Sequence, residues 1–322
     1  MGDVAMDRTE TISVEAILRD ELARENRALR GVAPVISHML ESSGHALVSD
    51  AIVARVRGML GDLARQMLAH GRPSHPREPT GQDKVDTLAA ALASDNHLLN
   101  HLYANAMEGH LTERLEHRSS VDPVLSQLLQ ELIASDTPLV AELAMATLAA
   151  QSRFMQNQRR MAIPLGELPS DLFALAIRRF MSAKLDLSQD EMVKTGRSLK
   201  AGYDEGAGRL ALLTRLVMAM GKGAVAALEL DHAGLALFVS AIASRSRQSR
   251  DLAVLGCHEH QAARLALSLR AAGLDPEGVE RQFLLLEPAE MLPEGLASVS
   301  SERARELLAA LELGDSFAEA AA

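Results

Sequence analysis

Histidines carry the clearest potential for chemistry in this chain. His97 and His101 are four residues apart, so a helix would place both imidazoles on one face, within reach of one metal ion. His110 lies further along the same predicted helix, and Glu108 and Glu113 could add carboxylate ligands. Structural zinc sites usually have closely paired ligands, however, and the HEXXH motif is absent. The main expectation is therefore surface or packing histidines with no bound metal. A metal or small-ligand site centred on His97, His101 and His110 is the alternative.

Other segments that could do chemistry do not match the motifs they resemble. Cys257 and His258 are adjacent, so on a helix their side chains point about 100° apart and cannot form a nucleophile–base pair. The segment 221–223 (GKG) lacks the earlier glycine and the following Ser or Thr of a phosphate-binding loop, and the glycines at 202–208 follow no predicted strand. The sequence therefore predicts no catalytic residue and no cofactor, and the protein is expected not to be an enzyme.

Composition and charge exclude several classes of partner. The 322 residues carry a formal net charge of −10, and only 2% are aromatic. An acidic surface repels phosphate backbones and few rings are available for base stacking, so nucleic acid is not expected as a partner. The single cysteine, Cys257, fits a reducing cytoplasm. The charge-free apolar stretch from His232 to Ser244 is shorter than the about 18 residues of a membrane helix. The prediction is a cytoplasmic protein without membrane contact.

The elements that must position these residues are expected to be helices. Apolar residues recur at helical spacing and Ala, Leu and Met dominate, so an all-α fold is predicted. Helices are expected at about 13–30, 35–42, 46–69, 85–93, 96–117, 123–134, 138–161, 170–183, 189–220, 231–248, 258–272, 276–286 and 301–312. Ser188 and Glu191 have capping-box spacing at one start, and the glycines at 202–208 should divide the 189–220 helix. Pro-rich and Gly-rich breaks fall at 71–82 and 162–170.

A short phrase that ends in Ser-Asp occurs three times, at 47–50, 92–95 and 133–136. Its serines, Ser49, Ser94 and Ser135, lie 45 and then 41 residues apart. Each phrase ends one apolar run and opens another, and stacked helix pairs repeat with a period of about 40 to 47 residues. The spacing predicts an α-solenoid. An irregular helical bundle with chance Ser-Asp caps is the alternative, because both residues are ordinary helix caps.

The segment 132–140 (LIASDTPLV), with Ala144 and Leu148 beyond it, resembles a HEAT repeat. In that family one helix ends in apolar residues, the chain turns through Asp and Pro, and the next helix restarts with inward-facing Val, Ala and Leu. The position after Val140, usually basic in the family, is Ala141 here. The resemblance is weaker over 88–115 and 45–70. It implies a HEAT-like helical-repeat lobe, and the break at 162–170 is expected to end that lobe. The prediction is a HEAT-like lobe over 1–165 and a second helical lobe over 166–322.

The C-terminal segment 252–288 is similar in pattern to uncharacterised HEAT-like proteins of alphaproteobacteria that form a family of unknown function. This resemblance implies a bacterial repeat scaffold and brings no catalytic residue. Because stacked repeats leave an extended surface, we expect a scaffold or regulatory adaptor that binds another protein through helix 138–161 and loop 71–82. Whether the chain also forms a homo-oligomer is left open. The residues expected to contact the partner are Glu142, Gln151, Arg153, Gln156, Gln158 and Arg159.

Overall fold

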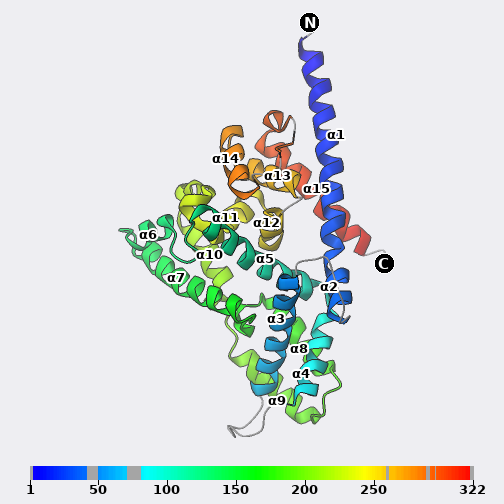
Figure 1. The fold of residues 1–322 in the computed structure, drawn as a ribbon. Helices are drawn as coiled ribbons and strands as arrows, with labels where there is room; N and C mark the ends of the chain where they lie inside the picture. The colour runs from blue at the N-terminus through cyan, green and yellow to red at the C-terminus, as the bar shows by residue number, and fades with distance from the viewer. Residues whose placement is uncertain are drawn as a thin grey trace. The chain divides into compact units, whose positions relative to one another are not determined.

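The described part of the chain is helical and contains no strand (Figure 1). A computed structural model describes residues 3–41, 50–70, 81–258, 261–287, 291–293 and 295–319. The predicted all-α class is confirmed. The solenoid arrangement, which is the finer part of that expectation, stays a prediction.

Most α-helices lie where apolar periodicity predicts them. Their bounds are α1 (Asp3–Arg30), α2 (Val32–Glu41), α3 (Asp50–His70), α4 (Gln82–Ala93), α5 (Asn96–Ser119), α6 (Gln127–Ile133), α7 (Pro138–Arg159), α8 (Ser170–Ser182), α9 (Gln189–Ala201), α10 (Arg209–Ala219), α11 (Leu230–Ser246), α12 (Arg250–Gly256), α13 (Ala262–Ala272), α14 (Pro276–Leu286) and α15 (Ser301–Glu319). The 3₁₀ segments are η1 (Leu165–Glu167), η2 (Glu205–Ala207), η3 (Gly221–Leu228) and η4 (Leu296–Ser298). The predicted division of 189–220 is confirmed, whereas α12 and η3 were not anticipated.

Side-chain caps explain several helix starts. The Ser188 hydroxyl accepts a hydrogen bond from the Glu191 N–H at 3.3 Å, and the Glu191 carboxylate accepts one from the Ser188 N–H at 2.8 Å, so the capping box is confirmed. Asp275 caps α14 by accepting a hydrogen bond from the Gly278 N–H at 2.8 Å, without a reciprocal bond. Several predicted starts are wrong. The helix expected from residue 258 begins at Ala262, and the helix expected from residue 123 begins only after Ser126. Ser126 provides its cap, while Asp122 closes a separate turn before it.

Two of the three Ser-Asp phrases connect successive helices as predicted. Ser94 follows the last residue of α4, and the Asp95 carboxylate caps α5 by accepting from the N–H groups two and three residues further on. Ser135 and Asp136 lie between α6 and α7. The first phrase, at 47–50, lies outside the described residues except for its last position. The predicted loop at 71–82 lies outside them except for its last two positions.

Contacts between residues divide the chain into two units, each discontinuous in sequence. Unit 1 comprises Met1–Gly31, His110–Met145 and Leu213–Ala322, and unit 2 comprises Val32–Gly109 and Ala146–Leu212. The limits fall inside α5, α7 and α10, so each of these helices gives residues to both units. Residues 165 and 166 both belong to unit 2. The boundary expected between them, at the limit of the two predicted lobes, stays a prediction.

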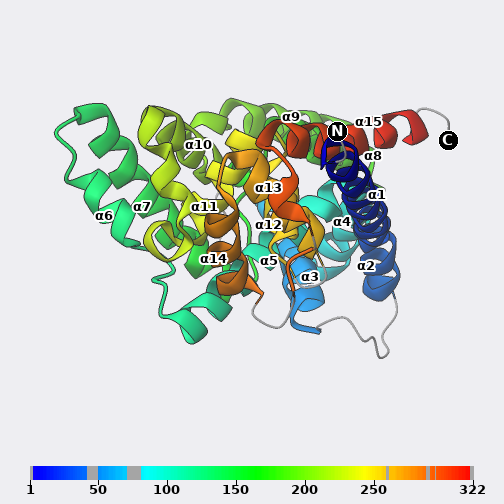
Figure 2. The same ribbon diagram turned by 90° about the horizontal axis from the view of Figure 1, so that it is seen from above.

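Unit 1 is built around α11 and α13, which lie side by side with α12 (Figures 1 and 2). The side chains from Ala263 to Leu269 are all buried, because α13 packs against α11, α12, α14 and α15 and α1 lies against it as well. The α11 helix also contacts α6. Gly234 has a φ of +71° within α11, and a Cβ there would lie 3.1 Å from the Ser126 Cβ, so this close approach requires glycine.

The α1 and α13 helices of unit 1 are joined by a half-buried carboxylate. Glu25 accepts hydrogen bonds from the N–H groups of Ala263 and Arg264, at 3.0 and 2.9 Å, and so caps the start of α13. Burial raises the pKa of Glu25 to about 7, against the lowering effect of these two hydrogen bonds. This carboxyl group therefore changes its charge near neutral pH while it holds two helices together.

Unit 2 is a smaller set of packed helices. The α3 helix contacts α2, α4 and α9, and α8 contacts α4 and α9. Gln66 of α3 fixes the segment that follows α7, because its amide donates to the Ile163 carbonyl at 2.8 Å and accepts from the Leu165 N–H at 2.9 Å. Asp62, one turn earlier, accepts from the Ile163 N–H at 3.1 Å. These bonds set the position of η1 against α3.

None of the described helices is by itself long and apolar enough to cross a membrane. The α10 and η3 helices meet those requirements only when they are taken together, with a bend of 115° between them.

Candidate functional sites

The exposed face of α7 carries most of the residues that the sequence assigns to partner binding. Helical spacing places Glu142, Met145, Ala149, Arg153 and Gln156 on one outward stripe, about 33 Å long over the whole helix. All five are exposed. The stripe is bordered by exposed residues at both ends, which are Pro138 and Leu139 at the start and Arg159 and Arg160 at the end. We call these nine residues the α7 stripe.

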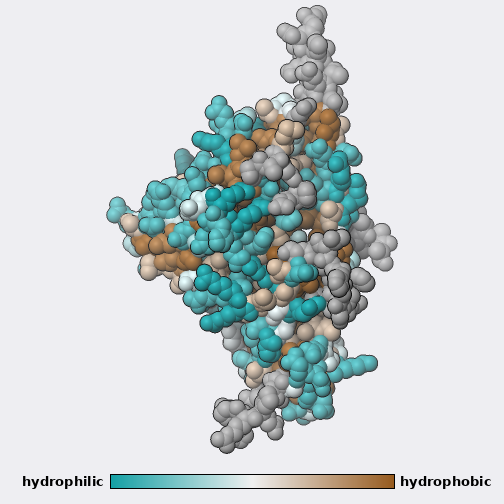
Figure 3. Space-filling view, viewed as in Figure 1, coloured by the Kyte–Doolittle hydropathy of each residue, from teal (hydrophilic) through white to brown (hydrophobic). Residues whose placement is uncertain are grey.

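The α7 stripe changes character along its length. Leu139 and Met145 are 55% and 52% exposed, which is high for large apolar side chains. Figure 3 shows hydrophobic side chains gathered over α6 and the start of α7. The far end of the stripe is basic, with Arg153, Arg159 and Arg160 all exposed. The stripe therefore joins an apolar part to a cationic part on one helix.

Two residues predicted for this surface are wrong. Gln151 and Gln158 are only 4% and 1% exposed, so neither can contact a partner. They lie seven residues apart, on the same inner face as the buried Phe154 and Met155. The spacing i, i+3, i+4, i+7 of these four residues marks a buried helical face and could have identified both glutamines as internal.

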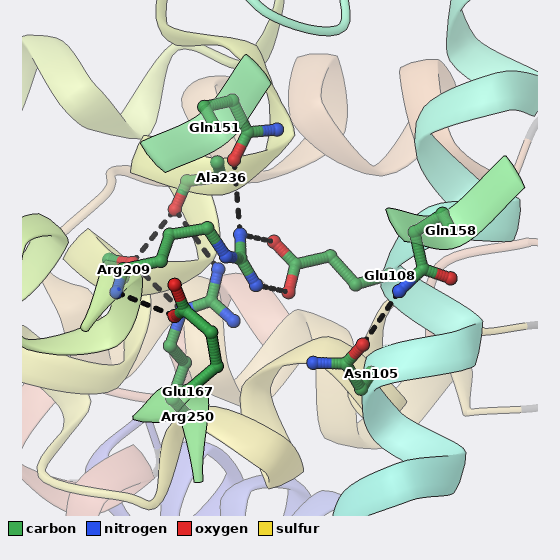
Figure 4. Close-up of polar contacts among 9 residues, drawn as sticks. Asn105, Glu108, Gln151, Gln158, Glu167, Arg209, Ala236 and Arg250 are labelled. Atoms are coloured by element: carbon green, nitrogen blue, oxygen red, sulfur yellow. Dashed lines mark hydrogen bonds and ion pairs between the residues drawn. The ribbon is translucent and has the colours of Figure 1, made fainter. Parts of the chain in front are cut away.

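Gln151 instead belongs to a buried polar network within unit 2 (Figure 4). The guanidinium of Arg209 makes two parallel bonds to the carboxylate of Glu108, both 2.8 Å long, and a third of 3.1 Å to the Gln151 side chain. It also lies over the ring of Phe154, 3.7 Å from the ring centre. The Arg209 N–H donates to Glu167 at 2.7 Å. Because Glu108 belongs to α5 and Gln151 to α7, the network ties these helices to the first residue of α10.

Gln158 makes the second buried contact between α5 and α7 in unit 2. Its amide nitrogen donates to the Asn105 side chain at 2.6 Å (Figure 4). One turn further along α5, a Cβ on Gly109 would lie only 2.6 Å from the Gln158 amide oxygen and 2.8 Å from its Cδ. The glycine therefore provides the space that the glutamine occupies. Both buried glutamines position helices and are not available for recognition.

The three predicted histidines all lie on α5 and differ in their surroundings. His97 is exposed, His101 is buried, and His110 is half-buried. Glu108, considered as an added ligand, is paired with Arg209 instead. Over the described residues, no group of three or more His, Cys, Asp or Glu side chains is placed to hold a metal ion. The structure thus does not bring His97, His101 and His110 together as one ligand set.

Cys257 is fully buried at the end of α12. Its thiol donates to the Ala253 carbonyl at 3.3 Å, one turn earlier. His258 is half-buried, and the nearby His260 lies outside the described residues. The cysteine fits the inner packing of unit 1.

A pocket of about 420 Å³ opens in unit 2 at a place that the sequence does not mark. Its size falls within the about 300–1,000 Å³ of small-molecule sites. One wall carries a stacked aromatic pair, Phe173 and Tyr203, with ring centres 3.9 Å apart and planes 10° from parallel. The pocket is lined by Gln66, Ala69, His70, Pro164, Leu165, Gly166, Phe173, Leu199, Gly202 and Tyr203.

The only local signal for this pocket is the glycine-rich stretch at 202–208, which the sequence assigns to a break between helices. Tyr203 lies in that break, and its hydroxyl donates to the Leu168 carbonyl at 2.8 Å. The partner ring, Phe173, is thirty residues earlier on α8. Apolar periodicity cannot relate the two rings, because their contact depends on how α8 and the end of α9 pack.

Comparison of this chain with protein-family models, with curated proteins and with solved structures finds no match.

Proposed function

We propose that this protein is a non-enzymatic scaffold or regulatory adaptor that binds another protein along the α7 stripe. The observation that carries the proposal is the change along that stripe from exposed apolar side chains to arginines. Nothing in the described part of the chain pairs with the side chains of Arg153, Arg159 and Arg160 as an ion partner. These cations are available to an incoming carboxylate.

The apolar part of the stripe would supply affinity. Burial of a Leu or Met side chain contributes roughly 1.5–3 kcal/mol when it leaves water, and both Leu139 and Met145 have more than half of their surface to bury. The unbranched thioether of Met145 can also adapt to the shape of a partner. Glu142 lies between them on the same face and would favour a nearby cation on the partner.

The position of the arginines has a second explanation, and the experiment must distinguish it from partner binding. Cations near the C-terminal end of a helix interact favourably with its dipole, so Arg159 and Arg160 also stabilise α7 itself. Arg153, almost two turns earlier, gains much less from the dipole because the effect decays within the last turn. The partner that fits all three is an acidic amphipathic segment, with apolar residues toward one end and Asp or Glu toward the other.

The test compares two variants that carry the same change in charge. The triple variant Arg153→Gln, Arg159→Gln, Arg160→Gln removes three positive charges from the stripe. The control removes three exposed positive charges elsewhere in unit 2 and consists of Arg178→Gln, Lys194→Gln and Arg197→Gln. Each tagged protein is used to capture partners from its native cells at low and at moderate salt, and co-purifying proteins are quantified.

We expect a near-stoichiometric partner with the wild-type chain and with the control, and at least a tenfold loss with the stripe variant. Leu139→Ser with Met145→Ser should lower capture by a similar factor without the same dependence on salt. Circular dichroism checks that each variant is folded. Equal capture by the stripe variant and the control, or no partner for the wild-type chain, would overturn the proposal.

A further inference from the structure

The pocket of unit 2 has a wall whose polar side chains are already engaged by the protein. The Gln66 amide is bonded to Asp62, to the Ile163 carbonyl and to the Leu165 N–H. The Tyr203 hydroxyl is bonded to the Leu168 carbonyl. The surface that this wall presents to a ligand is therefore mainly apolar. It consists of the aromatic pair and the side chains of Pro164, Leu165 and Leu199.

The ends of two helices determine the electrostatic character of this pocket. Ala69 and His70 are the last residues of α3, and Gly202 follows the last residue of α9. The aligned peptide dipoles of a helix place about half a negative charge at its C-terminal end. Two such ends reach the pocket, and its lining contains no Lys, Arg, Asp or Glu side chain.

Carboxylates add to this negative field near the aromatic wall. The pKa of Tyr203 is raised to about 12, first by burial and then by the negative charges of Glu205, Asp171 and Asp204. These three acidic residues are exposed and lie outside the lining itself. An anion in the pocket would meet repulsion from them and from both helix ends, whereas a cation would be attracted.

We propose that this pocket binds a small organic cation, with a flat or branched apolar body that packs on Phe173 and Tyr203 and an ammonium group that faces the ends of α3 and α9. Aromatic faces attract ammonium groups, and this attraction is strongest where water is excluded. The proposal is independent of the α7 stripe, so either one can fail alone.

The first experiment uses three probes with the same ring and different charges. Benzyltrimethylammonium is positive, benzyl alcohol is neutral, and phenylacetate is negative. Binding to the full chain is measured by isothermal titration calorimetry at pH 8. We expect the cation to bind at least tenfold more tightly than the alcohol, and phenylacetate to show no binding. Equal binding of the three probes, or no binding of the cation at 10 mM, would overturn the proposal.

A glycine in the lining allows a variant that adds bulk at the pocket. A Cβ on Gly166 would meet no atom within 4 Å, and its φ is compatible with other residues, so Gly166→Leu adds a large apolar side chain to the lining without straining the fold. Gly223→Leu in η3 is the matched control, because a Cβ there also meets nothing and the residue does not line the pocket. We expect at least a tenfold loss of cation binding in the first variant and less than a twofold change in the second. Binding within twofold of wild type in Gly166→Leu would overturn the proposed location.

Tyrosine fluorescence gives an independent readout of the same site. The chain has two tyrosines and no tryptophan, and Tyr103 is buried away from solvent, so an aromatic cation in the pocket should change the emission of Tyr203. Tyr203→Phe keeps the stacked ring and removes that emission. We expect the cation to alter the fluorescence of the wild-type chain and to leave that of Tyr203→Phe unchanged, while calorimetry still detects binding. A change that persists in Tyr203→Phe would place the cation elsewhere and overturn the proposal.

Discussion

Arg209 and Glu108 form a bidentate ion pair that is almost completely removed from solvent. Both N–O distances are 2.8 Å, and the two side chains are 2% and 1% exposed. Removing two charges from water is costly, and the planar guanidinium offsets that cost by matching both carboxylate oxygens at once. Gln151 and the Phe154 ring occupy further sides of the cation. The pair holds α5, α7 and α10 in one arrangement within unit 2.

Replacing only one residue of this ion pair should lower the free energy of unfolding more than replacing both. Arg209→Met leaves the Glu108 carboxylate buried without its cation, and we expect the free energy of unfolding to fall by about 3–5 kcal/mol. The double variant Arg209→Met with Glu108→Leu removes both charges of the pair. It should therefore be more stable than the single variant by about 1–2 kcal/mol. Urea unfolding followed by circular dichroism measures both. A double variant less stable than Arg209→Met would contradict this account.

Gly109 should be intolerant of a methyl group only while Gln158 is present. Gly109→Ala would bring its Cβ within 3 Å of three atoms of the Gln158 side chain, which is held by Asn105. We expect a loss of roughly 1–3 kcal/mol in stability from this overpacking. In a Gln158→Ala background the same substitution should cost less, because the opposing atoms are gone. A thermal-unfolding double-mutant cycle measures the coupling, with Gln156→Ala, on the exposed face, as the matched control. Additive effects would show that the two residues do not compete for space.

Glu25 should make stability depend on pH around neutrality. Its pKa is raised to about 7 in the folded chain from an ordinary 4.5, so the folded state holds a proton that the unfolded state releases between these values. The contribution is therefore fully present below about pH 4.5 and is lost as the pH rises through about 7. We expect this to amount to about 2 kcal/mol after allowance for solvent screening. Glu25→Gln keeps an acceptor for the α13 N–H groups and should flatten this part of the profile.

The measurement for Glu25 is the free energy of urea unfolding at intervals from pH 4.5 to 8. Glu280→Gln, which replaces an exposed carboxylate of unit 1, is the control and should retain the wild-type slope. A Glu25→Gln profile with the wild-type slope would show that another group is responsible.

The capping box of α9 should contribute measurably to unit 2. Ser188→Ala removes the acceptor for the Glu191 N–H and leaves that donor without its cap. We expect a loss of about 1 kcal/mol in the free energy of unfolding. Ser198→Ala, on the exposed surface of the same helix, should change stability by less than about 0.5 kcal/mol. Chemical unfolding of both variants side by side checks the difference, and an equal effect would exclude a specific role for the cap.

Features that depend on neighbouring residues could be predicted from the sequence. The helical class, the capping box at Ser188 and the break at 202–208 follow from propensity, side-chain reach and glycine, each of which acts over a few residues. Local rules gave a wrong start for α6, where two possible capping residues lie four positions apart. Asp122 precedes a proline, as a helix cap often does, but its carboxylate closes a separate turn, and α6 begins later with Ser126 as its cap. The short α12 was missed because it has too few turns to show a clear period.

The candidate sites were only partly predictable, because composition does not say which face of a helix is covered. Arg153, Gln156 and Arg159 are exposed, whereas Gln151 and Gln158 are buried. The sequence alone determined that α7 is a long helix with a polar second half. Which of its polar residues face inward was decided by the helices packed against it.

What only the tertiary structure decided is the pairing of residues distant in sequence. Glu108 and Arg209 are 101 positions apart, and the aromatic wall of the pocket joins residues of α8 to the break after α9. No local pattern specifies such pairs, because a charged or aromatic residue is equally compatible with solvent until a partner is brought to it. The sequence determined the helices and their caps by short-range physics. The choice of partners depends on which helices together bury the most apolar surface and satisfy the most buried polar groups.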